Sequence, residues 1–226
     1  MNQLSQAPIM RLFHLAIEPS SQKQFSVVGK SNLLTSLEKE AGTLFMATCQ
    51  LPDQDDMKLV YEIYQDQTAY ERHVASYHFQ DFANYAGQFV RHRQVINLQA
   101  ELLFEKEGKK ALENACDYSI RLAKITVNEE DAKQFRDVVA IEMEKAVQVE
   151  DGVISLFAAR DQSQLNQWYF FEIYQDESAY LAHIESEHFK TYIRDAAEFV
   201  GEKQLSILSG ELVISQGGLS YQQASL

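Results

Sequence analysis

The chain repeats itself at a fixed offset. The run Glu62–Phe79 reads Glu-Ile-Tyr-Gln-Asp-x-x-Ala-Tyr-x-x-His-x-x-Ser-x-His-Phe, and the same pattern returns over Glu172–Phe189, an offset of 172 − 62 = 110 residues. Gly42 and Gly152 keep this offset as well. A repeat of this length is a whole small domain, because solenoid units are far shorter. The sequence therefore predicts one fold that occurs twice, and the residues present in both copies are the first candidates for function.

We expect a first domain over residues 1–105, a linker over 106–117 and a second domain over 118–226. In the first domain, apolar and β-branched segments predict strands over 10–18, 44–51, 58–64 and 95–104, with helices over 20–40 and 66–93. The second helix is expected to break near Ser76, and the linker to be weakly helical. The second domain repeats this order, with strands over 118–127, 153–159, 168–174 and 205–215, and helices over 128–150 and 176–202. Both termini, 1–8 and 217–226, are expected to be loose tails.

Each half therefore has the order β-α-β-β-α-β, which is the ferredoxin-like arrangement and belongs to the α+β class. Asp66 and Asp176 are expected to cap the second helices, and Gly42 and Gly152 to end the first helices with a left-handed φ. A four-stranded sheet with helices on one face leaves its other face apolar and in need of a cover. Two such sheets in one chain can close on each other as an intramolecular dimeric α+β barrel. The alternative is two separate domains that each dimerise with another chain.

Composition limits the partners. The formal net charge of −13 over 226 residues argues against nucleic acid and against an anionic membrane surface. No apolar run approaches the roughly 20 residues of a membrane span, and no basic segment precedes an apolar one at the N-terminus. Cys49 and Cys116 fit no metal spacing and are expected to be buried, reduced thiols. These features predict a cytoplasmic protein.

The repeated run Glu-x-Tyr-x-Asp-x-x-Ala-x-x-x-His-x4-His-Phe resembles the antibiotic biosynthesis monooxygenase family, whose members form dimeric α+β barrels. The resemblance covers about 10–103 and 120–213, and the His-x4-His-Phe form is most similar to the quinol-monooxygenase and autoinducer-processing branches. It implies a small-molecule substrate and, for the oxygenases, dioxygen without a cofactor. In the haem-degrading members the iron ligand is a histidine four residues after the motif phenylalanine. Ala83 and Ile193 stand there, so haem is not expected.

His73 and His183 are the candidate catalytic bases. Imidazole takes and returns protons near neutrality, and oxygenation of a quinol begins with loss of a proton. The alternative role is packing of the helix. His78 and His188 lie five residues further on, about 140° around an unbroken helix, so they cannot form a metal pair with the first histidines unless the helix breaks. They are candidate substrate-binding residues, with capping of the break as the alternative, and no metal site is expected.

Tyr64 and Tyr174 end the third strands, where their hydroxyls could orient a substrate oxygen, and they complete the predicted catalytic set. Glu62 and Glu172 precede them by two residues and share their sheet face, so they are candidate substrate-binding residues. Packing of the tyrosine and a cross-sheet salt bridge of the glutamate are the alternatives.

The two halves differ in the first strand, where His14 corresponds to Lys124, and in the third, where Lys58 corresponds to Trp168. His14 and Lys124 are therefore candidate substrate-binding residues that could make the two pockets unequal.

The resemblance favours a cofactor-independent monooxygenase that acts on a small aromatic quinol-like compound. Two alternatives remain open at this point: an isomerase or tautomerase that acts on a small carbonyl compound, with or without a phosphate group, and a non-catalytic small-molecule-binding barrel.

Overall fold

The computed structural model describes residues 2–52, 54 and 56–223, and its two halves have the same element order. The first repeat contains β2 (Ile9–Ile17), α1 (Gln22–Lys39), β3 (Thr43–Gln50), β4 (Met57–Tyr64), α2 (Gln67–Ala75), α3 (Tyr77–Phe89) and β5 (Val90–Glu105). The second contains β7 (Ser119–Val127), α4 (Ala132–Val149), β8 (Val153–Asp161), β9 (Gln164–Tyr174), α5 (Glu177–Glu185), α6 (Glu187–Ala196) and β10 (Val200–Ser215). Three short strands lie outside this pattern: β1 (Asn2–Gln3), β6 (Lys110–Glu113) and β11 (Leu219–Gln222). The predicted β-α-β-β-α-β order is confirmed, with the second helix of each repeat divided in two.

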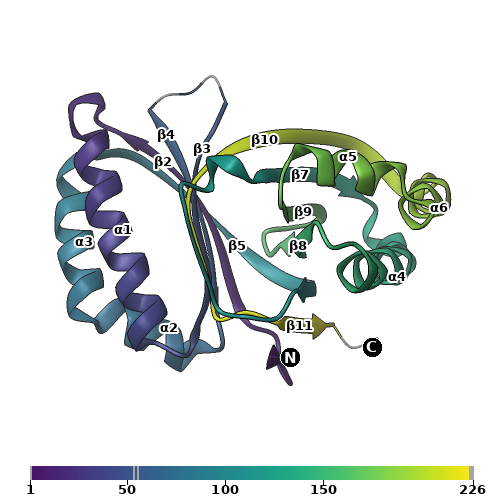
Figure 1. Cartoon of the computed structure of the whole chain (residues 1–226), viewed down its shortest axis with the longest axis horizontal. Helices are drawn as coiled ribbons and strands as arrows, with labels where there is room; N and C mark the ends of the chain where they lie inside the picture. Colours follow the sequence, from purple (N-terminus) through teal and green to yellow (C-terminus); the bar gives the residue numbers. More distant parts are fainter. Residues whose placement is uncertain (1, 53, 55, 224–226) are drawn as a thin grey trace.

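The eight long strands form one closed antiparallel barrel (Figure 1). Its order is β5-β2-β4-β3-β10-β7-β9-β8, and β8 returns to pair with β5. The last strand of each repeat crosses to the other repeat, so that Val213 on β10 faces Ala47 on β3, and Leu103 on β5 faces Phe157 on β8. The chain thus forms the predicted intramolecular pseudo-dimer, and the arrangement as two separate domains is excluded.

The interior of the barrel is a single apolar core shared by both repeats. The ring of Tyr61 stacks on that of Phe171 with centroids 4.6 Å apart, and Phe45 meets Phe157 edge-on at 5.0 Å. All four side chains are fully buried. Each buried side chain of this size stabilises the fold by roughly 1.5–3 kcal/mol, so the covered sheet faces supply much of the association energy of the two halves.

The outer faces of the sheets are covered by helices, α1 and α3 on the first repeat and α4 and α6 on the second (Figure 1). Because side chains alternate along a strand, Leu12 and Tyr61 point into the barrel while Phe13 and Val60 point toward α1 and α3. Each repeat therefore has a second, smaller apolar layer between its sheet and its helices, and an incompletely filled part of that layer leaves room for a ligand.

Gly42 and Gly152 are needed for a different reason from the one predicted. Neither has a positive φ. A Cβ on Gly42 would lie 2.6 Å from the Cβ of Ala69, and one on Gly152 would lie 2.4 Å from the Cβ of Ala179. The glycine allows the second helix to approach the start of the second strand closely, so the constraint is steric contact between elements and not backbone conformation.

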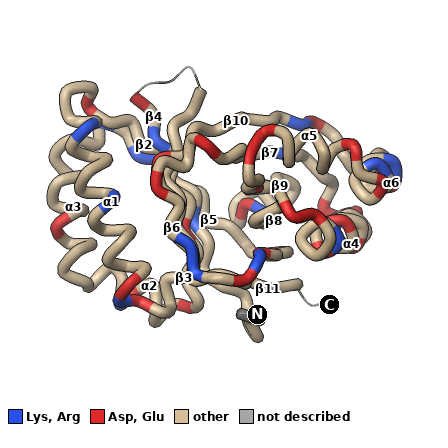
Figure 2. Tube along the Cα trace, in the orientation of Figure 1, with Lys and Arg blue, Asp and Glu red and all other residues tan. Residues whose placement is uncertain are grey.

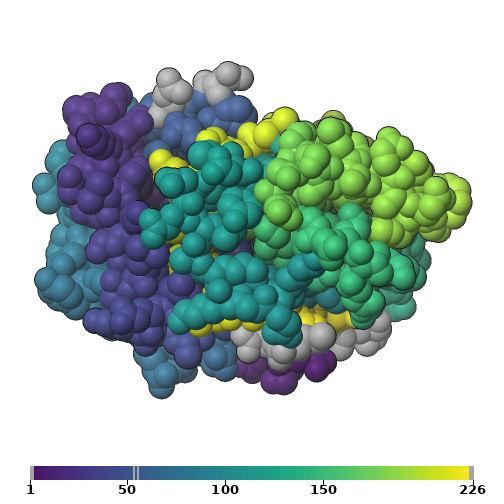
Figure 3. All heavy atoms as spheres, viewed as in Figure 1, coloured from purple at the N-terminus to yellow at the C-terminus, as the bar shows by residue number. Residues whose placement is uncertain are grey.

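The segment between the repeats and the termini are more ordered than expected. The linker has one short helical turn, a 3-10 helix over Ala115–Asp117, and also the strand β6, which pairs with β10. The teal linker segment covers the junction of the two halves on the face seen in Figure 3. The expectation of loose tails is also wrong for their described part, because β11 pairs with β5 and, in parallel, with β1. Residues 1 and 224–226 lie outside the described residues. Both cysteines are free, and Cys116 is exposed where a buried thiol was expected.

Candidate functional site

A cavity of about 480 Å³ lies between the sheet of the first repeat and helices α1 and α3. Strands β2 and β4 form its floor, and most of its wall is apolar. The main apolar lining residues are Phe13, Leu15, Phe25, Val60, Phe79 and Phe82. A space of this size and character suits a small aromatic molecule.

Glu62 and Tyr64 are two of the polar groups in this wall, and the structure brings them together as their spacing predicted. The Tyr64 hydroxyl donates a hydrogen bond to Glu62 Oε2 at 3.0 Å. Burial raises the pKa of Glu62, an effect that the nearby His73 and the Tyr64 hydrogen bond partly oppose. Burial, and then the charge of Glu62, raise the pKa of Tyr64 well above its usual value, so Tyr64 remains a neutral donor.

Asn32, on α1, is a third polar group of the wall and was not predicted. Its side chain is 4% exposed, and its Oδ1 has no hydrogen-bond partner among the described residues. A buried oxygen without a donor is costly, so this position favours a ligand that brings an N–H or O–H group.

His73 is buried but does not line the cavity. Its Nδ1 bonds Glu40 Oε2 at 2.8 Å, and its ring lies 5.3 Å from that of Tyr64 between centroids. Its Nε2 has no described partner. The predicted base therefore stands behind the cavity wall, next to Tyr64, and not in direct reach of a ligand.

The helix break expected near Ser76 brings the second histidine to the first. Ser76 ends α2 and caps α3, where its Oγ accepts from Phe79 N at 3.3 Å. His78 Nε2 then lies 2.9 Å from Glu40 Oε1, and the two imidazole centroids are 5.8 Å apart. The atoms that Glu40, His73 and His78 could offer to a metal ion all lie within 4.8 Å of one another. Each ring is held by a different oxygen of one carboxylate, so Glu40 orients both histidines.

Glu40 was missed from the sequence. It follows α1 and reaches motif histidines that lie more than 30 residues later in the chain. Its counterpart is Glu150, since 150 − 40 = 110, and each glutamate stands two residues before the repeated glycine. Retention of a carboxylate in both copies at this position was the available signal.

The second repeat keeps the same set of polar residues, although both of its histidines lie on one oxygen of the glutamate. Tyr174 donates to Glu172 Oε2 at 3.0 Å, and Glu150 Oε1 lies 2.9 Å from His183 Nδ1 and 2.5 Å from His188 Nε2. As predicted, Asp66 and Asp176 cap α2 and α5, the helices that carry His73 and His183, each accepting from a backbone N–H at 2.8 Å. The motif therefore builds one local structure twice.

The comparisons with known proteins agree with this fold. The sequence profile of the family described as antibiotic biosynthesis monooxygenase (ABM) matches residues 8–85 and again 119–195. The chain belongs to this family. Among curated proteins, none matches the chain. No helix in the described part of the chain is long and apolar enough to cross a membrane.

Solved structures show the same tandem fold. Two described as "putative monooxygenase", from Lactobacillus acidophilus NCFM and Fusobacterium nucleatum, are 24% and 20% identical with TM-scores of 0.90 and 0.86. They cover 96% and 98% of this chain and all of their own. An anthrone oxidase-like protein is 12% identical, covers 98% of both chains and has a TM-score of 0.57. At these identities the likeness establishes the fold.

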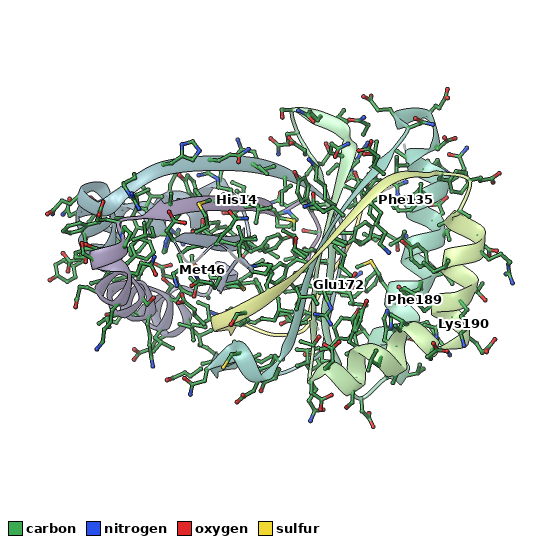
Figure 4. The ribbon with its side chains drawn as sticks, turned by 90° about the horizontal axis from the view of Figure 1, so that it is seen from above. His14, Met46, Phe135, Glu172, Phe189 and Lys190 are labelled. Carbon is green, nitrogen blue, oxygen red and sulfur yellow. The ribbon has the colours of Figure 1, made fainter. Side chains whose placement is uncertain are left out.

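The second ABM repeat has little room for a ligand. The space between its sheet and helices is about 40 Å³, although Glu172 and His183 line it. Val139 occupies the position of Gly29, and Trp168 that of Lys58, where it packs edge-on against Phe135 at 4.9 Å. Figure 4 shows Phe135, Glu172 and Phe189 gathered between the sheet and helices of this repeat. Two further enlargements fill the layer: Phe170 for Val60 and Tyr192 for Phe82.

His14 and Lys124 lie away from both spaces. His14 is half-buried and has the parity of the core residue Leu12, so it belongs to the barrel side of β2 (Figure 4). Lys124 Nζ lies 5.8 Å from the ring centroid of Tyr169, another barrel-side residue. The first strand does line the cavity, but through the odd-numbered Arg11 and Phe13. The difference in volume between the two spaces therefore comes from the differing residues at positions 29, 58, 60 and 82 of the first repeat, and not from His14.

The second repeat completes the first cavity. Glu211, on β10, forms an ion pair with Lys58 and accepts from Ser26 Oγ at 3.1 Å. Lys58 also donates to Gln50 Oε1 at 2.8 Å. Because Glu211 and the adjacent Leu212 both line the cavity, this site needs the closed barrel and not one repeat alone.

Proposed function

We propose that the chain is a cofactor-independent monooxygenase that oxidises a small aromatic, quinol-like compound in the cavity of the first repeat. The observation that carries the proposal is the carboxylate–phenol pair of Glu62 and Tyr64 in the wall of a largely apolar cavity of about 480 Å³. Membership of the ABM family supports the reaction class.

Glu62 is the group that first accepts the substrate proton. Burial raises its pKa, which makes the carboxylate a stronger base toward a phenolic hydroxyl. His73 does not reach the cavity, and its proximity lowers the pKa of Glu62, so its role is to tune that carboxylate from behind. Tyr64 orients the pair through its hydrogen bond. Glu62, which the sequence suggested as a binding residue, thus takes the role of base, and His73, the predicted base, becomes a residue that positions and tunes Glu62 without touching the ligand.

The deprotonated ring is electron-rich and reduces dioxygen directly. For an anthrone-type ring, the methylene carbon loses its two hydrogens and gains one oxygen atom. The second oxygen atom leaves with those hydrogens as water, so the substrate supplies all four electrons. The apolar wall excludes bulk water from the anion during this step.

Oxygen consumption by the purified protein tests the proposal, with menadiol and anthrone as substrates. Glu62→Gln should lower kcat by at least about 100-fold, the usual contribution of a general base. The matched control is Glu172→Gln in the filled repeat, which should keep the activity. No oxygen uptake above the uncatalysed rate, or full activity in Glu62→Gln, would refute the assignment. Turnover of a carbonyl compound under nitrogen would favour the isomerase instead.

A further inference from the structure

Arg11 is a cation of the first cavity that forms no ion pair with any carboxylate of the described residues. Its guanidinium lies 3.9 Å from the ring centroid of Tyr70. Its Nε is buried and has no hydrogen-bond partner within the described chain. Stacking on an aromatic face holds the planar guanidinium in place and leaves its edge available to a carboxylate or a similar anion.

In the second repeat the corresponding arginine has a carboxylate partner, although its Nε and Nη1 are buried without a hydrogen-bond partner among the described residues. The counterpart Arg121 stacks on Tyr180 at 4.1 Å in the same way, but its Nη2 also bonds Glu177 Oε2 at 2.5 Å. The residue that corresponds to Glu177 in the first repeat is Gln67, which instead donates to Glu71. The repeat that contains the cavity therefore lacks the carboxylate that pairs with the arginine in the other repeat.

The charges around the first cavity leave a positive surplus. Lys58 and Lys30 are paired with Glu211 and Glu113. Arg11 and Arg93 then face the single unpaired carboxylate of Glu62 within the described lining. Acidic residues are spread over both halves of the molecule (Figure 2), whose net charge is −13. A cationic cavity in such a protein favours an anionic ligand over a neutral one.

We propose that the substrate of this site is an aromatic compound with an acidic substituent, such as a carboxylate, which Arg11 binds with Arg93 as the second cation. This proposal rests on the proposed function only in placing the ligand in the first cavity, and it does not depend on the reaction that follows. A guanidinium on a carboxylate forms charge-assisted hydrogen bonds, and the surrounding apolar wall strengthens them. The acidic group would fix the orientation of the ring relative to Glu62.

Binding of two matched probes without turnover tests this inference. 1-Hydroxy-2-naphthoate and 1-naphthol share the ring and the hydroxyl and differ by the carboxylate. Titration calorimetry under nitrogen measures both, so that oxygen chemistry does not enter. The intact chain should bind the acid about tenfold more tightly than the naphthol, the equivalent of one charge-assisted hydrogen bond. Arg11→Gln should remove this preference.

The second repeat supplies a sharper variant. Gln67→Glu with Glu71→Leu copies Glu177 and Leu181 into the first repeat, and should give Arg11 the ion pair that Arg121 has. The preference for the acid should then fall about tenfold, while 1-naphthol binds as before. Glu71→Leu alone is the matched control for folding, and Glu177→Gln is the control in the other repeat. Both should keep the preference.

Equal affinity for the two probes, binding of neither probe, or a preference for the acid that survives both Arg11→Gln and the Gln67→Glu/Glu71→Leu variant would overturn the inference. Oxygen consumption is measured separately. A chain that prefers the acid but consumes no oxygen would therefore refute the monooxygenase proposal and leave the anion site standing.

Discussion

The Tyr64 hydroxyl donates to Glu62 Oε2 at 3.0 Å, two residues back on the same strand, and the Tyr174–Glu172 pair has the same distance. The bond is therefore a local product of the Glu-x-Tyr spacing and forms whether or not a cavity is present. What differs is the neighbourhood. In the first repeat the pair lines a cavity of about 480 Å³, and in the second the corresponding space is about 40 Å³.

The pH dependence of the reaction should follow Glu62. The carboxylate must be ionised to accept a proton, so kcat/KM should rise with pH through its raised pKa. Tyr64→Phe removes a hydrogen bond that lowers this pKa, and the acid limb of the profile should move to higher pH. Tyr174→Phe should leave the profile in place. An unshifted acid limb in Tyr64→Phe would show that another group controls ionisation.

Filling the first cavity with larger side chains should weaken the binding of substrate there. Gly29→Val with Val60→Phe copies Val139 and Phe170 of the filled repeat. A Cβ on Gly29 would meet Phe82 Cε2 at 3.7 Å, an ordinary contact, so folding should be retained. We expect kcat/KM to fall at least about tenfold, because the wall no longer admits an aromatic ring.

The reverse change, Val139→Gly with Phe170→Val, is the control for this prediction. It should leave the oxidation rate unchanged, because the first cavity is intact. If the variant with the filled first cavity kept its activity and the variant with the opened second repeat lost it, the reaction would take place in the second repeat, against the proposal. Titration calorimetry should also find one ligand per chain in the unaltered protein.

The barrel could be predicted because the evidence for it is local and occurs twice. A gapless offset of 110 residues defined two equal units, and each unit had an apolar sheet face that needed a cover. The pairing of β5 with β8 and of β10 with β3, which joins the two repeats, followed only from the structure, since strand pairing across the junction leaves no periodic signal. Gly42 was correctly singled out, but its reason, contact with Ala69, depends on how two elements meet in space.

The candidate site was predictable where partners are close in sequence and not where they are distant. Glu62 and Tyr64 share a face because they are two residues apart on a strand. The partner of His73 is Glu40, which directly follows α1, and spacing cannot reveal such a pairing. His14 was misplaced because the parity that faces the cavity depends on which side of β2 the helices cover. The direction of His73 relative to the cavity is set by the same packing.

Close contact between Gly42 and Ala69 should make the position intolerant of a methyl group. Gly42→Ala places its Cβ 2.6 Å from that of Ala69 and should cost about 1–3 kcal/mol of unfolding free energy. Ala69→Gly in the same chain should restore part of this loss, because it removes the second methyl. Urea unfolding of the two single variants and the double variant measures the coupling.

Gly87→Ala is the comparison for this pair, since nothing lies within 4 Å of its added Cβ and it belongs to α3. It should raise the unfolding free energy by about 0.5–1 kcal/mol through helix propensity. Additive effects of Gly42→Ala and Ala69→Gly would show that the two methyl groups do not collide.

Stability of the second repeat should fall as pH rises, because of Glu142. This glutamate occupies the position of Asn32, and burial, with Glu172 and Glu150 nearby, raises its pKa to about 8. The folded state therefore binds the proton more tightly than the unfolded state. Its stabilising effect is complete below about pH 4.5 and is lost as pH rises through 8. The glutamine side chain of Glu142→Gln is neutral at every pH, so the variant should be more stable than the parent at pH 8 by about 2–4 kcal/mol.

Urea unfolding of the parent and Glu142→Gln at pH 5, 6.5 and 8 measures this difference, which should be smallest at pH 5. Glu172 also has a raised pKa, so part of the slope should remain in the variant. His183 Nε2 lies 3.5 Å from Glu142 Oε1, and a protonated imidazole there would hold the carboxylate in its ionised form. If unfolding free energy changed equally with pH in the two proteins, His183 would be pairing with a Glu142 that is already ionised. Stability is lost with rising pH only if Glu142 is neutral in the folded state at low pH and then ionises.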